Sequence, residues 1–184
     1  GCHVAAAFKW WMLMDRARPF PQAWRAHFAG LAANLCLPGA AGGDAVRAGL
    51  AHVALKDGPK VAAAAVGDRL IDMVGLACLS LLGLVFLSGK GNAVLAYSLA
   101  AIVIGGAVLA LFIFPPVARW LWGKHPGLPA RSLGLRLAES FGALGRRPGL
   151  IVFALVLSAA IQAILIWLSI KLAQPVGVNI SAAA

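Results

Sequence analysis

The sequence predicts an all-α fold, a polytopic transmembrane helical bundle that contains a Gly-rich re-entrant or interfacial helical hairpin. The first observation behind this prediction is composition, because 61% of the 184 residues are hydrophobic and 12% are charged. Soluble domains average about 45–50% apolar and about 25% charged residues, so a soluble globule is excluded. The second observation is a set of long uncharged stretches, and the third is a Pro- and Gly-rich turn between short helical segments. Disorder is excluded too, since it requires low hydrophobicity.

The long apolar stretches predict a single transmembrane domain over residues 1–184. We expect it to be part of a longer membrane protein, because the chain opens and closes within apolar helical sequence. A spanning helix needs about 20 mainly apolar residues, and spans are predicted at about 61–88, 93–114 and 150–170. The uncharged second span is expected to stop at Pro115–Pro116. Residues 4–14 are interpreted as a truncated span, with Lys9 and Trp10–Trp11 near an interface.

Three shorter stretches are helical without being clean spans. Re-entrant or interfacial helices are predicted at about 22–37 and 44–56, and an amphipathic interfacial helix at about 132–144. The first contains an apolar stripe at helical spacing, formed by Trp24, Phe28, Leu31 and Leu35. The helix at 132–144 is amphipathic and basic, which suits a helix that lies in the headgroup layer.

The basic residues predict the orientation of the spans. The chain carries 16 Lys and Arg against 6 Asp and Glu, a formal net charge of +10. A nucleic-acid-binding protein can be this basic but does not need long uncharged stretches, so no nucleic-acid partner is predicted. Cytoplasmic loops of membrane proteins are enriched in Lys and Arg. We therefore expect a multi-pass protein of the inner (plasma) membrane, with the region 16–60 and the basic loop 115–148 in the cytoplasm.

One polar region distinguishes this chain from a generic membrane bundle. Its residues are Asn34, Pro38, Gly39, Gly42, Gly43, Asp44 and Arg47, followed later by Asp68, Arg69 and Asp72. Pro38 is expected to end one helix, and the glycines permit a tight reversal. Asp44 is then expected at the N-cap of the next helix, with Arg47 one turn inside. Irregular backbone at membrane depth is tolerated where it is buried in protein or lines a wet cavity, which makes this hairpin a candidate site.

Two roles stay open for the hairpin. A helix N-terminus beside Arg47 offers backbone N–H groups and a guanidinium that suit a phosphate. Alternatively, Asp44 merely caps the helix and pairs with Arg47 at i,i+3 while the glycines pack. The two roles are compatible.

The second part of the polar region lies within the first predicted span. Asp68 and Asp72 are spaced i,i+4 and share a helix face, with Arg69 adjacent. Ionisable residues in a span usually face a cavity or a partner, although Asp68 and Arg69 could also lie in headgroup water before the span begins. A buried network of Asp44, Arg47, Asp68, Arg69 and Asp72 would be structural if it were fully paired. It would be functional if an anionic headgroup competed for its arginines.

Motifs for catalysis, metal binding and cofactor binding are not found in this sequence. The sequence has no P-loop, dinucleotide-binding, zinc-protease or nucleophile-elbow pattern. Cys2, Cys36 and Cys78 show neither disulfide nor zinc-ligand spacing. No catalytic residue, metal or cofactor is therefore predicted, and any enzymatic domain would lie outside this chain.

The polar region resembles the transmembrane region of lysylphosphatidylglycerol synthases, a family also described as flippase-like membrane proteins. The resemblance is carried by Asn34-x-x-x-Pro38-Gly39-x-x-Gly42-Gly43-Asp44-x-x-Arg47 and the later Asp68-Arg69, and it covers mainly Phe28–Leu76. Asp72 stands where many members have Gly. Family members are longer and have more spans.

The resemblance implies a polytopic bacterial or archaeal inner-membrane protein. In bifunctional members this region translocates an aminoacylated phospholipid that a separate cytoplasmic domain makes. For this chain it implies that the polar residues listed above bind a substrate lipid, an anionic or modified phospholipid or a polyprenyl-linked lipid, and move it between leaflets. Arg47 and Arg69 would contact the headgroup phosphate. The alternative is a non-transporting scaffold that docks a lipid-modifying enzyme or glycosyltransferase.

Overall fold

The computed structural model describes residues 1–36, 41–87, 93–125 and 131–173, and within these ranges the regular structure is entirely helical. This confirms the predicted all-α class. The elements are α1 (Cys2–Leu13), α2 (Phe20–Cys36), α3 (Ala41–Leu55), α4 (Gly58–Leu87), α5 (Ala93–Val108), η1 (Leu109–Ile113), α6 (Phe114–Lys124), α7 (Arg131–Gly145) and α8 (Pro148–Ala173).

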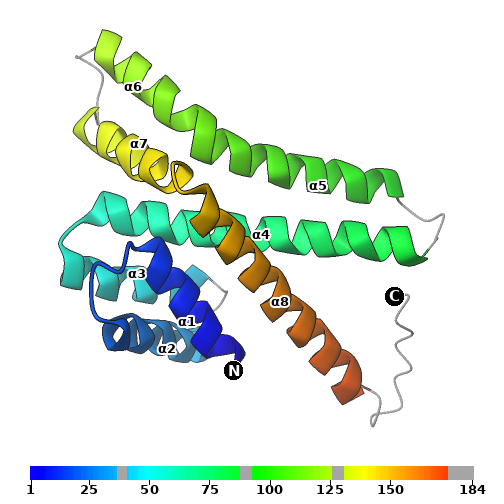
Figure 1. Ribbon diagram of the computed structural model, residues 1–184. Coiled ribbons are helices and arrows are strands. Elements are labelled where there is room, and N and C mark those ends of the chain that lie inside the picture. The colour runs from blue at the N-terminus through cyan, green and yellow to red at the C-terminus, as the bar shows by residue number, and fades with distance from the viewer. Residues whose placement is uncertain (37–40, 88–92, 126–130, 174–184) are drawn as a thin grey trace.

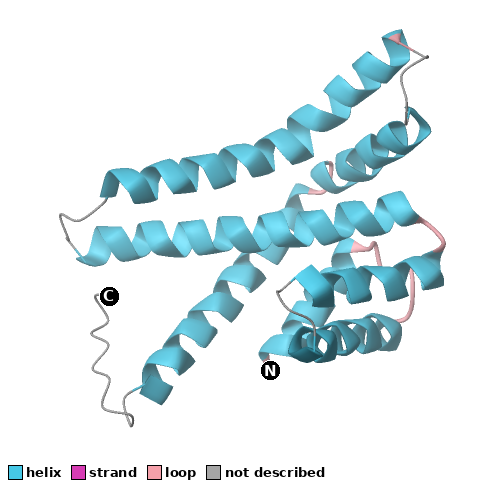
Figure 2. Cartoon of the chain, turned by 180° about the vertical axis from the view of Figure 1, so that it is seen from behind, coloured by secondary structure: helices cyan, strands magenta, loops and turns pink. Residues whose placement is uncertain are grey.

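The long helix α4 is the centre of the molecule (Figure 1). It packs against α5 and α7 on one side and against α1 and α3 on the other, while α8 crosses it obliquely. Helices α2 and α3 pack side by side, and α1 packs against both α2 and α8. Figure 2 shows the same helical arrangement from behind. The N-terminal helices therefore form a compact three-helix unit whose inner face is closed by α4 and α8.

The helix that begins at Ala93 continues beyond Pro115–Pro116, which corrects the predicted stop. It passes through the π-helical turn η1 and runs on as α6 to Lys124. The two prolines lie in the first turn of α6. Proline is tolerated at such a position because its missing N–H matters least there, and the wider π turn before it accommodates the change in hydrogen bonding.

Two of the described helical segments, Tyr97–Lys124 and Pro148–Ala173, are long and apolar enough to cross a membrane. Helix α4 is longer than either, but it carries Asp68, Arg69 and Asp72 in its first half. The span at about 61–88 and the truncated span at 4–14 therefore remain predictions.

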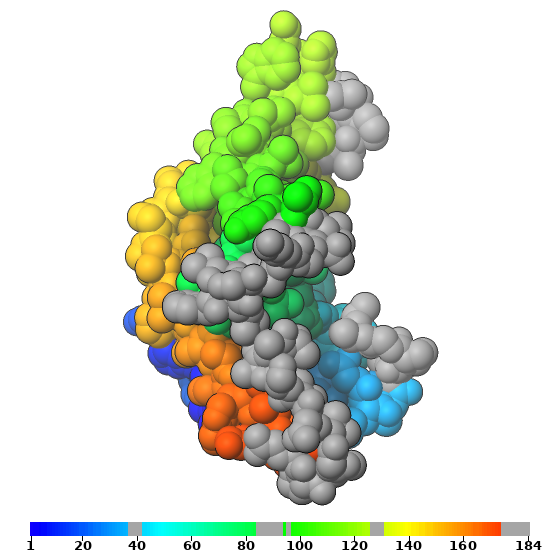
Figure 3. Space-filling model, turned by 90° about the vertical axis from the view of Figure 1, so that its right-hand side faces the viewer, coloured from blue at the N-terminus to red at the C-terminus, as the bar shows by residue number. Residues whose placement is uncertain are grey.

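Large apolar side chains lie on the surface of the molecule, whereas small side chains form its packed interfaces. On α8, Ala154 and Ser158 are buried, while Val152, Val156 and Trp167 are exposed. Figure 3 shows this helix, orange to red, at the surface. Helix α2 follows the same rule, since its packed face contains Ala23, Ala26 and Gly30 and the predicted apolar stripe faces outward at Phe28 and Leu35. Close helix packing through small residues, with bulky ones outside, is typical of helices that face lipid.

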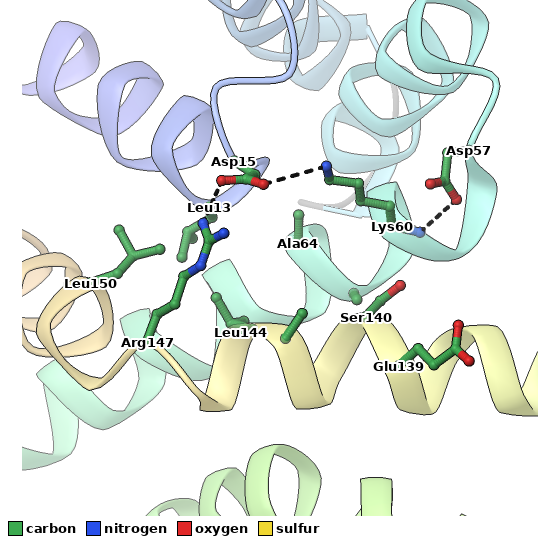
Figure 4. A pocket seen from close by; sticks show the side chains of 12 residues that line it. Leu13, Asp15, Asp57, Lys60, Ala64, Glu139, Ser140, Leu144, Arg147 and Leu150 are labelled. Carbon is green, nitrogen blue, oxygen red and sulfur yellow. Dashed lines mark hydrogen bonds and ion pairs between the residues drawn. The ribbon is translucent and has the colours of Figure 1, made fainter. Parts of the chain in front are cut away.

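Asp15, in the connection between α1 and α2, forms ion pairs with Arg147 at the junction of α7 and α8 and with Lys60 of α4. Asp15 accepts a hydrogen bond from Arg147 and lies 3.9 Å from Lys60 Nζ. These groups line a cavity of about 260 Å³ whose other acidic residues are Asp57 and Glu139 (Figure 4). The hydrogen bond from Arg147 lowers the pKa of the Asp15 carboxyl below its ordinary value of 3.8, and the charges of Lys60 and Arg16 add to this effect.

The lowered pKa of Asp15 predicts a pH-dependent contribution to stability. A carboxyl whose folded-state pKa is depressed stabilises the fold above its unfolded pKa and loses that contribution as pH falls through the folded value. We expect wild type to have a higher Tm than Asp15→Asn at about pH 6 and the difference to shrink below about pH 3.8. Thermal unfolding of both proteins across this range measures the difference, and a gap independent of pH would contradict the assignment.

Candidate functional site

The structure brings most of the predicted polar residues to one place. A cavity of about 210 Å³, here called the polar cavity, lies where α1, α2, α3, α4 and α8 meet. Seven of the predicted residues line it, namely Asn34, Gly43, Asp44, Arg47, Asp68, Arg69 and Asp72. Gly42 stands in the first turn of α3 without lining the cavity. Pro38 and Gly39 lie outside the described residues.

Asp44 is not the N-cap of its helix, because α3 begins earlier than predicted, at Ala41. It lies in the first turn, where a carboxylate is favoured by the positive end of the helix dipole. A side chain from the preceding helix satisfies part of that turn instead, since the Gly43 N–H donates to Asn34 Oδ1 at 2.7 Å. Asn34 therefore serves an otherwise unpaired N–H of the first turn, the role expected of a cap.

Two glycines bring α2 and α3 into close contact beside the cavity. A Cβ atom built on Gly30 would lie 2.7 Å from Gly43 O, and one built on Gly43 would clash with Gly30 O and Asn34 Oδ1. Real Cβ atoms essentially never approach this closely. The glycines thus set the separation of the two helices and hold Asn34 within reach of α3.

The deepest part of the site is a chain of ion pairs. Lys9 Nζ lies 3.1 Å from Asp68 Oδ1, and Arg47 Nη2 donates to Asp68 Oδ2 at 2.9 Å. The side chains of Lys9, Asp68 and Arg47 are 3%, 4% and 8% exposed. Charges as deeply buried as these persist only when they are paired, so Asp68 is the anion on which both buried cations depend.

The outer part of the site is more accessible. Arg69 Nε donates to Asp44 Oδ2 at 2.5 Å, and Asp44 Oδ1 lies 3.4 Å from Arg47 Nη2. Asp72 accepts hydrogen bonds from Lys9 and, at 2.5 Å, from Ser158 Oγ of α8. Arg69 is 47% exposed and is the most open member of the set. We call Lys9, Asp44, Arg47, Asp68, Arg69 and Asp72 the charge cluster.

Lys9, which the sequence predicts to lie near a membrane interface, is a member of the charge cluster that the sequence did not indicate. Its side chain is buried there, and Trp10 beside it is fully buried. With Lys9 included, the cluster contains three cations and three carboxylates, so its formal charges cancel. The sequence pattern predicts two of these cations, Arg47 and Arg69.

Several polar groups around the cluster lack hydrogen-bond partners within the described residues. Both ring nitrogens of the buried His27 are unpaired, as is Arg47 Nε, while Asp68 Oδ1 has Lys9 Nζ as its ion-pair partner at 3.1 Å. All three residues line the polar cavity. The Arg47 guanidinium also lies over the Trp10 ring, 4.7 Å from its centroid, a favourable cation–π geometry. The cavity therefore offers unused donors and acceptors, together with cations that an incoming anion can reach from the Arg69 side.

Several site residues were not anticipated from the sequence, among them Lys9, Ser158 and Gln162. Gln162 Nε2 donates to the Asp72 backbone carbonyl at 2.7 Å and to Ser158 Oγ at 3.1 Å. A signal for the last two existed, because Ser158 and Gln162 are an i,i+4 polar pair within the apolar stretch 150–170. Polar residues in such a stretch usually face a partner inside the bundle. In the part of the chain that the structure describes, no group of His, Cys, Asp and Glu side chains is arranged to hold a metal ion.

Comparison with known proteins identifies the family. The family model described as "Lysylphosphatidylglycerol synthase TM region" matches residues 1–184. Neither the curated proteins nor the solved structures yield a match. The matched family is a membrane domain with lipid-related functions, which agrees with the two apolar helices and with the large apolar side chains exposed on the surface. The chain is therefore a membrane protein that belongs to the lysylphosphatidylglycerol synthase transmembrane-region family.

Proposed function

We propose that the polar cavity binds the headgroup of a membrane lipid, an anionic or modified phospholipid or a polyprenyl-linked lipid, and that this module moves the lipid between leaflets. The protein that contains it is proposed to be a multi-pass protein of the bacterial inner membrane, with its basic segments 16–60 and 115–148 in the cytoplasm. The predicted site residues, extended by Lys9, Ser158 and Gln162, are its proposed binding set.

The observation that carries this proposal is the graded exposure of a neutral charge cluster. Buried ion pairs are weak contributors to stability compared with apolar packing of the same volume, so a cluster of this size is better accounted for by a role in binding. The cluster has a buried end at Lys9 and Asp68 and an accessible end at Arg69. An anionic headgroup can enter at Arg69 and compete with Asp44 for that arginine.

The chemistry of the exchange keeps the cluster satisfied throughout. A phosphate that displaces Asp44 gives Arg69 a charge-assisted hydrogen bond of the same kind that it gives up. Asp44 remains 3.4 Å from Arg47, so its carboxylate keeps a cation partner. A headgroup can thereby pass from the rim toward Arg47 without leaving a buried charge unpaired, which is the costly state in a membrane.

A scrambling assay tests the proposal. The full-length parent protein is reconstituted into liposomes containing a fluorescent phosphatidylglycerol, and the loss of outer-leaflet fluorescence on adding a membrane-impermeant reductant is followed in time. We expect Arg69→Gln and Arg47→Ala to slow the protein-dependent rate by about tenfold or more, since each loses a charged contact of the size that separates affinities by this factor. Exposed Arg136 on α7 is the matched control, and Arg136→Gln should retain the wild-type rate.

The outcomes separate the two functional hypotheses. Unchanged scrambling in both cluster variants would refute the polar cavity as the headgroup site. Absence of scrambling by the wild-type protein would refute translocation and favour the scaffold, which predicts co-purification of a lipid-modifying enzyme with the full-length parent.

A further inference from the structure

A second cavity, larger than the polar cavity, lies at the opposite end of the three-helix unit. It has a volume of about 500 Å³ and is enclosed by the end of α1, the first turns of α2 and the last turns of α3. Its apolar lining includes Trp10, Leu50 and Val53, and its charged lining residues are Arg18, Arg25 and Lys56. We call it the basic cavity.

The charges of the basic cavity are of one sign. No acidic residue lines it, and within the described residues none of its three cations forms an ion pair with a carboxylate. This contrasts with the polar cavity, where cations and carboxylates balance. Arg18 is held across the mouth because its Nη2 donates to the Ala54 carbonyl at 2.5 Å. Its remaining N–H groups, together with Arg25 and Lys56, leave positive charge uncompensated beside apolar walls.

The apolar part of the cavity continues onto the outer surface. Leu50 and Val53 of α3 are 46% and 74% exposed. A ligand that places an anion among the three cations can therefore extend a hydrocarbon chain over these side chains. The volume falls within the range of about 300–1,000 Å³ that is usual for small-molecule sites.

We propose that the basic cavity is a second lipid site, which binds a phospholipid with a net-anionic, phosphate-bearing headgroup. The phosphate lies among Arg18, Arg25 and Lys56, and the acyl chain lies along Leu50 and Val53. A free phosphate ion would contact the three cations alone, whereas a phospholipid also covers the apolar lining with its acyl chain. Charge complementarity excludes a zwitterionic headgroup as the preferred ligand, because no carboxylate is present to receive its cation.

The two cavities have no lining residue in common. Trp10 lines the basic cavity, is fully buried, and carries on its ring the Arg47 guanidinium that lines the polar cavity. The second site is therefore independent of the charge cluster, and it does not rest on the proposed function. A variant of either cavity should leave ligand binding at the other unchanged.

Site-resolved photo-crosslinking tests this proposal. The full chain in a neutral maltoside detergent is incubated with lysophosphatidylglycerol that carries a diazirine in its acyl chain, irradiated, and digested for peptide mass spectrometry. We expect labelling of the peptides that contain residues 22–26 and 50–56. The double variant R25Q/K56Q should reduce this labelling by about tenfold, because each basic side chain near an anionic lipid contributes appreciably to its binding. The matched control K124Q/R136Q removes the same charge from exposed positions outside the cavity and should change it less than about twofold.

Two further arms decide between the possible ligands, and one variant separates this site from the polar cavity. The same diazirine probe with a phosphocholine headgroup should label these peptides weakly, and excess glycerol phosphate should not abolish labelling by the anionic probe. Equal labelling by both probes, complete competition by glycerol phosphate, or an equal loss in K124Q/R136Q would each overturn the proposal. In the Arg69→Gln variant the anionic probe should label the basic cavity as it does in wild type, even if this variant fails to scramble lipid.

Discussion

Replacing Asp68 by Asn is expected to destabilise the protein by about 3–5 kcal/mol, the largest effect of any single substitution considered for this chain. Asp68 is the carboxylate that lies between the two buried cations Lys9 and Arg47. An amide of the same shape keeps the packing but removes the charge, so both cations lose a partner in a region closed to water. The free energy of unfolding, measured by titration with SDS in mixed micelles, reports the loss.

Asp57→Asn is the matched control for this experiment. Asp57 is exposed, its Oδ1 accepts the Lys60 N–H at 3.3 Å, and Asn can accept the same hydrogen bond. The same formal charge is therefore removed with little expected change. If Asp68→Asn and Asp57→Asn destabilise the protein equally, the buried ion pairs contribute nothing beyond net charge.

A second substitution distinguishes charge imbalance from a packing defect. Lys9→Met in the Asp68→Asn background restores a cluster of equal positive and negative charge, in which Arg47 and Arg69 keep Asp44 as a partner and Asp72 keeps the hydrogen bond from Ser158. We expect the free energy of unfolding to fall by less in the double variant than the two single variants would lose together, because residues in one ion-pair network couple energetically. Strict additivity would show that Lys9 and Asp68 do not interact.

Replacing Gly43 by Ala should destabilise the protein by about 1–3 kcal/mol, as is usual for overpacking. The added methyl group would clash with the Gly30 carbonyl and with Asn34 Oδ1, neither of which can move without separating α2 from α3. The hydrogen bond from the Gly43 N–H to Asn34 should be lost with the contact. The same SDS titration measures the effect.

Gly49 in the same helix supplies a control of opposite sign. A Cβ atom at Gly49 meets nothing within 4 Å, so Gly49→Ala removes the entropic disadvantage of glycine in a helix, about 0.5–1 kcal/mol. We expect it to raise stability while Gly43→Ala lowers it. Two changes of the same sign would mean that the close approach of Gly30 and Gly43 does not limit the packing of the hairpin.

Local sequence pattern was enough to predict the class of fold and seven of the residues that line the polar cavity. The i,i+4 spacing of Asp68 and Asp72 and the glycine before Asp44 are short-range signals, and Gly43, Asp68 and Asp72 do meet at the cavity. The partners of these residues could not be predicted in the same way. Lys9 reaches Asp72 across 63 positions of sequence, and Ser158 reaches it across 86. Such pairs depend on how α1 and α8 pack on α4, about which no window of local sequence is informative.

Helix ends were predicted less well where two local rules competed. Pro115–Pro116 is a strong stop signal by itself, but the preceding π turn places the prolines at the start of a new helical segment. At α3, the small residues Ala41 to Gly43 extend the helix toward its N-terminus because Asn34 of the neighbouring helix satisfies a backbone N–H there. In both cases a feature outside the local motif decides where the helix begins.

The π turn also fixes the rotational phase of α6 about its own axis. Each residue of an α-helix advances by about 100°, so deleting one residue from Leu109–Ile113 would turn everything after it by about that angle. The face of α6 that meets α7 is closely fitted, because Cβ atoms on Gly134 and Gly142 would lie 2.7 Å from the Trp122 ring and 3.0 Å from Arg119. After such a rotation neither side chain would meet its glycine. The extra residue in that turn therefore sets how the apolar helix α5 is oriented relative to the amphipathic helix α7.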